Sequence, residues 1–195
     1  MPRFTRAELE SFRGAEVPDL VGASVRLVFV GINPSSYSAR AGHYFARRSN
    51  RFWPAFSRSR LSLPLRAALG RDALGPEDDH LLPRFGVGFT DVVKRPTANA
   101  AELRPADYQR GVPELLARLA RFEPRAVCFH GVTGFRPVLR YGLARTLPEI
   151  ALGPQPVRLG MIPVFVVPNP SPANAHFTLE DQIAWYDRLD EWLDS

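Results

Sequence analysis

Residues 31–53 hold most of the side chains of this chain that could do chemistry together. They begin with Gly-Ile-Asn-Pro, directly after the apolar, β-branched run 25–30, which predicts a buried strand. Asn33 thereby places an amide at the carboxyl end of a strand, the edge where open α/β sheets bind ligands. Phe45 and the arginines near it suit stacking on a flat base and holding a phosphate. The segment therefore predicts a pocket for a nucleobase.

Two later loops are expected at the same edge of the sheet, because each also follows a predicted strand. Residues 85–93 predict a strand that carries Asp91 at its end. A strand that ends at residue 167 leads into Asn169 and Ser171. Loops at the carboxyl ends of parallel strands converge in space. With the first loop, they would bring together two amides, an aromatic face, a carboxylate and a hydroxyl.

Strands and helices alternate along the chain, which is typical of a sheet covered on both faces. The other expected elements are short helices at 6–12, 50–61 and 135–141, an amphipathic helix at 105–122, strands at 126–129 and 157–159, and a final helix from Thr178. We therefore predict a three-layer α/β/α fold with a central, mostly parallel sheet of four to five strands. One domain is expected over residues 1–195, with residues 1–22 as an N-terminal arm.

Three local patterns sharpen this outline. Gly111 and Pro113 lie inside the helical pattern and predict a kink or a break there. Residues 70–84 are acidic and rich in turn formers, which indicates a surface connection. Thr178 and Asp181 have the spacing of a capping box, so the final helix should begin there.

Composition limits the classes of function. The formal net charge is +5 and the sequence pI about 10.0, which favours a polyanionic partner. Lys94 is the only lysine, and arginine suits phosphate where a bidentate contact is needed. Cys128 is the only cysteine, which excludes an intrachain disulfide and a cysteine-ligated zinc or iron–sulfur site. We expect no metal and no cofactor. Because no stretch is apolar enough to span a membrane, a cytoplasmic protein without a membrane partner is expected.

Several ordered motifs resemble those of the bacterial mismatch-specific uracil/thymine DNA glycosylases, which belong to the uracil-DNA glycosylase superfamily. The similarity runs from about residue 25 to the final helix. The motifs are Gly-Ile-Asn-Pro at 31–34, Gly-x-x-Phe-Ala at 42–46 with Asn-Arg-Phe-Trp at 50–53, Gly-x-x-Thr-Asp-x-Val-x-Arg-Pro-Thr at 86–97, and Asn-Pro-Ser at 169–171. The resemblance implies a monomeric base-excision enzyme, associated with the nucleoid, that flips uracil or a mispaired pyrimidine out of double-stranded DNA and leaves an abasic site.

The resemblance also implies roles for individual residues. Asn33 would contact the flipped base or the attacking water, and Phe45 would stack on the base. Other positions expected at the substrate are Gly31 and Ile32 of the first motif, Ser38 beside the pyrimidine C5 position, Asn169 at the head of the last motif, and Ser171 at a backbone phosphate. Arg47 and Arg48, with Arg51 beside them, are candidates for phosphate contacts, or else a solvated face.

The chain departs from the family pattern at two places. The last motif typically continues Gly-Leu-Ser, whose leucine wedges into the duplex, whereas here Pro172, Ala173 and Asn174 follow. A smaller plug should fill the vacated stack less well, or leave the task to Pro172 or His176. The second departure is Asp91, because members of the group often lack an acid in the site.

Asp91 has a chemical use in such a site. Breaking a glycosidic bond develops positive charge on the sugar, and a carboxylate there stabilises this charge and can orient or deprotonate water. Asn33 can position water but cannot take its proton. The alternative is that Asp91 only caps a helix or lies in a solvated loop. His80 and His130 show no evident partners and are interpreted as structural.

Two other functions stay open on the sequence. The chain could be a binding module that recognises flipped bases or abasic sites without turnover, although such a module has no need of a carboxylate beside anionic DNA. It could also be an unrelated α/β nucleotide-binding enzyme that uses residues 31–34 as a phosphate loop. That alternative lacks both Gly-x-Gly-x-x-Gly and a Walker lysine motif.

Overall fold

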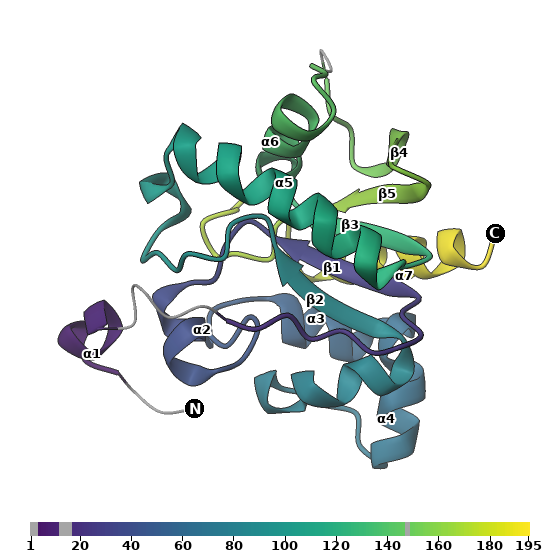
Figure 1. The fold of residues 1–195 in the computed structure, drawn as a ribbon. Helices are drawn as coiled ribbons and strands as arrows, with labels where there is room; N and C mark the ends of the chain where they lie inside the picture. The colour runs from purple at the N-terminus through teal and green to yellow at the C-terminus, as the bar shows by residue number, and fades with distance from the viewer. Residues whose placement is uncertain (1–3, 12–16, 147–148) are drawn as a thin grey trace.

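The structure, a computed structural model, describes residues 4–11, 17–146 and 149–195. At its centre lies a five-stranded sheet in the order β2-β1-β3-β5-β4 (Figure 1). The strands are β1 (Leu27–Gly31), β2 (Val87–Asp91), β3 (Ala126–His130), β4 (Gly153–Leu159) and β5 (Ile162–Val167). Four of them run parallel, and β4 runs antiparallel to β5 at one edge. The predicted mostly parallel sheet is confirmed.

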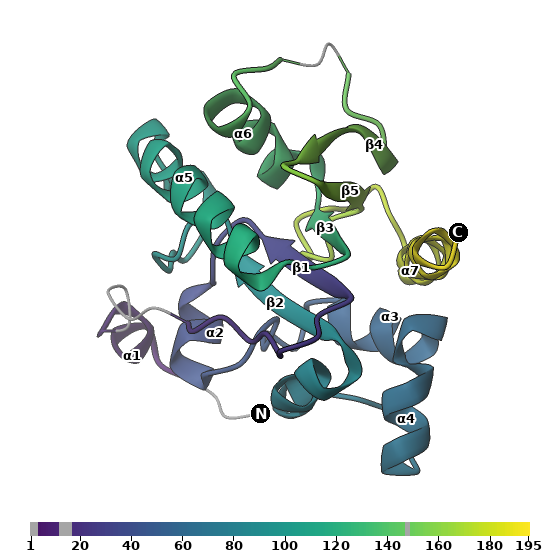
Figure 2. The ribbon, with the colours of Figure 1, turned by 45° about the vertical axis from the view of Figure 1, so that its right-hand side comes forward.

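Helices cover both faces of this sheet. They are α1 (Arg6–Ser11), α2 (Ser36–Ala41), α3 (Phe52–Arg58), α4 (Leu63–Leu69), α5 (Pro105–Phe122), α6 (Val132–Gly142) and α7 (Leu179–Leu193). Figure 2 shows α5 and α6 side by side over one face, with α3 and α7 on the opposite face. The result is the expected three-layer α/β/α architecture.

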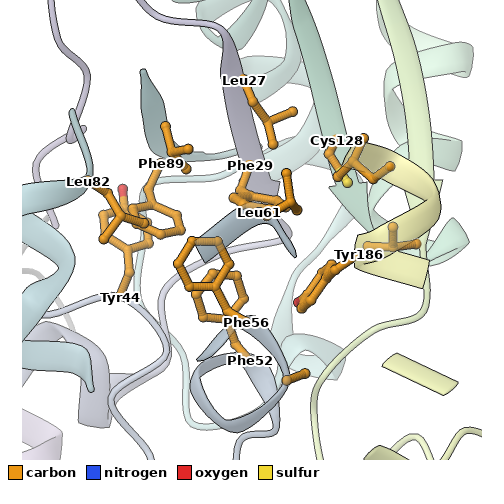
Figure 3. Packing of buried hydrophobic residues seen from close by; sticks show 14 of the residues in the cluster. Leu27, Phe29, Tyr44, Phe52, Phe56, Leu61, Leu82, Phe89, Cys128 and Tyr186 are labelled. Atoms are coloured by element: carbon orange, nitrogen blue, oxygen red, sulfur yellow. The ribbon is translucent and has the colours of Figure 1, made fainter. Parts of the chain in front are cut away.

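The two faces bury different kinds of side chain. The face under α3 and α7 is aromatic: Phe29 of β1 stacks on Phe89 of β2 with ring centroids 5.9 Å apart, and Phe52 and Tyr186 meet Phe29 edge-on (Figure 3). The face under α5 and α6 is mainly aliphatic. Because parallel strands covered on both sides have no solvent face, their residues are apolar without alternation, as the five buried residues of β1 illustrate.

Helix α5 is continuous from Pro105 to Phe122, so of the kink or break predicted at Gly111 and Pro113 the break is wrong. Gly111 serves packing, since a Cβ at this position would lie 2.5 Å from the carbonyl oxygen of Val92. Pro113 removes one backbone donor, but Val112 and Leu115 on either side are fully buried against the sheet. Tertiary packing therefore offsets the local cost of the proline.

The prediction of a surface connection over residues 70–84 is also wrong in part. Pro76–Phe85 form a 3₁₀ helix in which Asp78, Asp79 and Leu82 are buried. A buried carboxylate needs hydrogen-bond donors, and Asp79 finds them in the loop after β1. This acidic segment thus supports the loop that carries Phe45.

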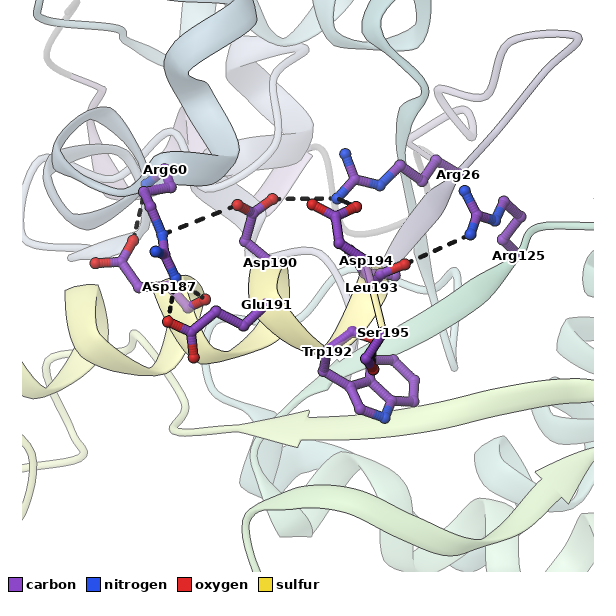
Figure 4. A network of polar contacts seen from close by, with 10 residues as sticks. All are labelled: Arg26, Arg60, Arg125, Asp187, Asp190, Glu191, Trp192, Leu193, Asp194 and Ser195. Atoms are coloured by element: carbon purple, nitrogen blue, oxygen red, sulfur yellow. Dashed lines mark hydrogen bonds and ion pairs between the residues drawn. The ribbon is translucent and has the colours of Figure 1, made fainter.

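Helix α7 begins at the predicted capping box. The amide of Asp181 donates to Thr178 Oγ1 over 3.1 Å, and the Thr178 amide donates to Asp181 Oδ2 over 2.8 Å. The outer side of α7 carries acidic residues that pair with Arg26 and Arg60 (Figure 4). Such exposed pairs stabilise a protein by about 0–1 kcal/mol each, so they orient the helix more than they stabilise it.

Candidate active site

A cavity of about 740 Å³ opens at the carboxyl ends of β1, β2, β3 and β5. Its lining includes Asn33 and Phe45 from the loop after β1, Asp91 from the end of β2, His130 from the end of β3 and Asn169 from the loop after β5. Residues predicted at the substrate from three separate motifs therefore share one cavity. Gly31, Ile32 and Ser38 also line it.

Gly31 makes room for the carboxylate of Asp91. The two residues are paired across β1 and β2, and a Cβ on Gly31 would lie 2.4 Å from Asp91 Oδ1. Any larger residue at position 31 would therefore displace the carboxyl group from its place over the strand end. The glycine of the Gly-Ile-Asn-Pro motif is required by packing against an acid that the sequence places 60 residues later.

Asn33 is oriented by the loop after β2. Its Nδ2 donates to the carbonyl oxygen of Arg95 over 2.9 Å and to Thr97 Oγ1 over 2.8 Å. Both amide hydrogens are thus used within the protein. Among the described residues no donor reaches Asn33 Oδ1, which leaves an acceptor at the cavity for water or for a base N–H group.

Phe45 is held as a platform. Its ring stacks on Phe52 with centroids 4.3 Å apart, and the residue lines the cavity. The residue has φ 54°, a left-handed conformation that is uncommon outside glycine and needs support from its surroundings. On either side, the Tyr44 amide donates to Asp79 Oδ2 over 2.9 Å and the Ala46 amide to Ser38 Oγ over 3.3 Å.

Asp91 is a buried carboxylate with spare hydrogen-bonding capacity. Asp91 is only 3% exposed, and its Oδ2 has no hydrogen-bond partner among the described residues. Burial raises the pKa of Asp91 to about 6, while the nearby cations Lys94 and Arg118 act in the opposite direction. A carboxylate with this pKa is ionised at neutral pH and is still basic enough to accept a proton. The interpretation of Asp91 as a solvated loop residue or a helix cap is wrong, because Asp91 closes β2 and is buried.

His130 is buried and lines the cavity, whereas from the sequence we interpreted it as a structural residue without evident partners. Its Nε2 is 3.0 Å from the hydroxyl of Tyr186, and its ring stacks on Phe29 at 5.0 Å. Burial lowers the pKa of His130 to about 3, so the ring is neutral at physiological pH. Its Nδ1 has no partner within the described part of the chain. Only its position at the end of a predicted strand could have indicated this place.

Asn169 begins a tightly turned loop. Its Oδ1 accepts a hydrogen bond from the Ser171 amide over 2.9 Å, and its carbonyl oxygen accepts one from the amide side chain of Asn174 over 3.0 Å. The Nδ2 group of Asn169 has no acceptor among the described residues and remains a donor at the cavity. Asn33 and Asn169 therefore present opposite hydrogen-bonding groups, an acceptor and a donor.

Arg51 connects this loop to the one that carries Phe45. Its guanidinium donates to the carbonyl oxygens of Phe177, of Ser171 at 3.0 Å and of Asn174 at 2.6 Å. The backbone amide of Arg51 also donates to Pro170 O over 3.0 Å. Arg51 thus has a structural task in this loop, and its contact with a phosphate stays a prediction.

The mouth of the cavity carries the remaining candidates for DNA contact. Arg47 and the exposed Pro172 and Ala173 line it, as do Ser171 and Asn174. Arg48 is exposed beside Arg47 and lies outside the lining. The side chain of Asn174 is turned into its own loop, so of the three residues 172–174 only the first two present free side chains at the mouth.

The polar groups of the cavity are amides, hydroxyls, a carboxylate and an imidazole. Within residues 4–11, 17–146 and 149–195, nowhere do three or more His, Cys, Asp or Glu side chains come together as a metal site would need. No helix in the same ranges is long and apolar enough to cross a membrane. The arrangement can bind a planar, hydrogen-bonding ring against Phe45 and place a carboxylate and an amide oxygen near its attachment point.

Two comparisons bear on the family. The family model of the uracil DNA glycosylase superfamily matches residues 18–193, nearly the whole chain. The solution NMR structure of a candidate uracil DNA glycosylase from Methanosarcina acetivorans is similar in fold, with a TM-score of 0.52 at 17% sequence identity, over 93% of this chain and 98% of that one. At this identity the second comparison speaks for the fold alone. The family match over residues 18–193 shows that the chain belongs to the uracil DNA glycosylase superfamily.

Proposed function

We propose that the chain is a monofunctional DNA glycosylase of the mismatch-specific type. It flips uracil, and other mispaired or altered pyrimidines, out of duplex DNA and hydrolyses the N-glycosidic bond to leave an abasic site. In this proposal it acts as a monomer with one domain and without a cofactor. The observation that carries the proposal is that Asn33, Phe45 and Asp91 line one cavity, with one oxygen of the carboxylate unpaired among the described residues.

The base is captured between an aromatic face and two amides. The ring of Phe45, which lines the cavity, stacks on the pyrimidine, an interaction typically worth about 1–3 kcal/mol. Asn169 Nδ2 donates to a carbonyl oxygen of the ring, and Ser38 lies along the wall beside it. The neutral His130 lines the cavity without adding a charge to it.

Hydrolysis needs negative charge at the sugar and a directed water. The C1′–N1 bond breaks and its electron pair leaves with the base, while the sugar develops oxocarbenium character that the carboxylate of Asp91 stabilises. Asn33 Oδ1 accepts a hydrogen bond from the water, whose oxygen adds to C1′ and whose proton passes to Asp91. The pKa of about 6 suits Asp91 to both tasks at neutral pH.

One further observation supports hydrolysis without a covalent intermediate. The only lysine, Lys94, has a side chain that is 10% exposed and forms an ion pair with Asp19 at 2.8 Å, so its amine is not presented to a substrate sugar.

At the mouth, Arg47, Arg48 and Ser171 are the groups we assign to backbone phosphates. Pro172 and Ala173 take the place behind the flipped base, where they fill the vacated stack less completely than leucine would.

The test is an incubation of excess protein with end-labelled duplexes that carry uracil opposite guanine, uracil opposite adenine, thymine opposite guanine, or no lesion. Alkali then reveals abasic sites, and borohydride trapping is run in parallel. We expect cleavage after alkali at uracil opposite guanine, none in the undamaged duplex, and no trapped covalent complex. Binding of the lesion without any abasic product would support the binding module instead. A trapped complex would overturn the monofunctional mechanism.

A further inference from the structure

The segment before β1 lies against the outer edge of the sheet. Leu20 pairs with Phe89 of β2 through two backbone hydrogen bonds, of 3.1 and 2.8 Å. Gly88 permits this approach, since a Cβ there would lie 2.9 Å from the carbonyl oxygen of Leu20. The pairing covers an edge strand that would otherwise be open. It also fixes the position of the residue before Leu20, which is Asp19.

Asp19 is the centre of a partly buried charge cluster. Its Oδ1 accepts hydrogen bonds from Thr90 Oγ1 at 2.7 Å and from Lys94 Nζ at 2.8 Å. Its Oδ2 is 3.2 Å from Nε of Arg118. The side chains of Asp19, Lys94 and Arg118 are only 10–15% exposed, so water and salt screen these charges weakly.

The same cluster surrounds Asp91. Thr90 precedes Asp91 in β2, and Nη2 of Arg118 donates to the Asp91 carbonyl oxygen over 2.7 Å. Lys94 follows in the next loop, and its Nζ lies 3.4 Å from the hydroxyl of Tyr44, a residue that lines the cavity. The charged and titratable groups that act on the Asp91 carboxylate are therefore Lys94, Asp19, Arg118 and Tyr44.

We propose that Asp19 is a positioning residue for Asp91: it binds Lys94 and Arg118 and so keeps both cations from pairing with the Asp91 carboxylate, which stays available to the substrate. This inference rests on the proposed function of Asp91. The geometry explains why Asp91 Oδ2 has no partner among the described residues although two cations are near. Without Asp19, the flexible Lys94 would be free to turn toward that oxygen.

The network predicts opposite effects for two substitutions. Asp19 raises the pKa of Asp91, whereas Lys94 lowers it. Asp19→Asn should therefore lower the pKa of Asp91 by about one unit, and Lys94→Met should raise it, because a nearby charge shifts a carboxyl pKa by about 1–3 units. The double variant should return close to the wild type. General damage to the fold would not shift the two single variants in opposite directions.

The experiment follows the carboxyl ¹³C signals of protein labelled at aspartate, titrated without DNA. The Asp91 signal is identified by its loss in Asp91→Asn. Asp187→Asn, which removes an equal charge on the outer side of α7, is the matched control and should leave the Asp91 titration in place. In single-turnover excision at neutral pH, Asp19→Asn should slow the reaction roughly 3- to 10-fold, and Asp19→Glu should recover part of the rate.

Opposite shifts of the Asp91 titration in Asp19→Asn and Lys94→Met support the proposal. Absent shifts, or shifts in one direction, overturn it. If Asp19→Asn does not fold, Lys94→Met decides alone, since an unchanged or lowered Asp91 pKa in that variant is incompatible with the proposal. Failure of wild-type protein to release any base would reject the proposed function. Release that depends on Asp91, with an unmoved titration in both variants, rejects only this inference.

Discussion

The cavity has a charged half and a neutral half, which shift the pKa of a buried ionisable group by different causes. At the ends of β1 and β2, Asp91 lies among charges and has its pKa raised only to about 6. At the ends of β3 and β5, His130 lies among aromatic rings and has its pKa lowered to about 3, with burial as the only cause. Burial favours the neutral form of both groups. In the charged half, Lys94 and Arg118 oppose the effect of burial on the pKa of Asp91, whereas in the neutral half no charge offsets the effect of burial on the pKa of His130.

The charged and the neutral half of the cavity fit the two parts of the substrate in glycosidic hydrolysis. The sugar becomes cationic in the transition state and needs a negative charge beside it. The base is a neutral, planar ring that needs stacking and hydrogen bonds. In the proposed function, the charged half therefore faces the sugar and the neutral half holds the base.

The largest effect is expected on catalysis in the charged half. Asp91→Asn keeps the shape but removes the charge and the base, so the single-turnover rate should fall about 10²- to 10⁴-fold, the contribution of a positioned general base. Affinity for lesion-bearing duplex should stay within a few-fold, as a filter-binding or anisotropy titration would show. A rate close to that of the wild type would remove Asp91 from the mechanism.

The same substitution should stabilise the protein. The pKa of Asp91 is raised in the folded state, so its stabilising contribution is complete below its unfolded pKa near 3.8 and is lost as pH rises through about 6. At pH 7 the ionised carboxylate then costs roughly 3 kcal/mol, from a shift of about two pKa units. Urea unfolding should show Asp91→Asn more stable than wild type by up to this amount at pH 7, with little difference at pH 4. An equal gain at both pH values would mean that charge is not the cause.

The neutral half should respond to pH in the opposite sense. His130 has a lowered folded-state pKa, so its contribution to stability is complete above the unfolded value of 6.5 and is lost as pH falls toward 3. Between pH 7 and pH 5 this residue should lower the free energy of unfolding by about 2 kcal/mol. The difference in stability between wild type and His130→Asn should narrow by that amount over this range, whereas a constant difference would contradict a buried neutral imidazole.

The smallest effect concerns capture of the base. Phe45→Ala should weaken binding of the flipped base by about 1–3 kcal/mol, seen as a higher half-saturating protein concentration in single-turnover excision. Phe56→Leu is the matched control. Like Phe45, Phe56 stacks on Phe52, with ring centroids 5.4 Å apart, but it lies outside the cavity lining. If wild type, Phe45→Ala and Phe56→Leu reach half-saturation at similar protein concentrations, Phe45 contributes to packing and not to capture of the base.

Local sequence patterns were sufficient for the strands and for most of the cavity. Strands with uniformly apolar residues, such as β1, can only be buried on both faces, and polar residues directly after them must collect at one edge of a parallel sheet. Asn33, Asp91 and Asn169 were predicted on that basis and do line one cavity. The capping box of α7 was readable because it depends on four consecutive residues.

Contacts between segments that are distant in the sequence could not be predicted from local patterns. Asp79 lies in an acidic stretch typical of a surface turn, yet it is buried beneath the loop of Phe45. Arg51 sits among arginines that all look solvent-exposed, yet it holds the loop after β5. The predicted break in α5 failed for the same reason, because contact with Val92 rather than helix propensity explains Gly111.

The positions of the strands along the chain, and the polar residues that follow them, were predicted from periodicity and residue type, which are properties of neighbouring residues. The order β2-β1-β3-β5-β4 in the sheet comes only from the tertiary structure. Which acid stays ionised and which histidine stays neutral depends on folding, because a pKa reports the charges and the water that surround a group in space. Asp19 lies 72 residues before Asp91 in the chain, and only the pairing of its segment with β2 brings it to the same cluster.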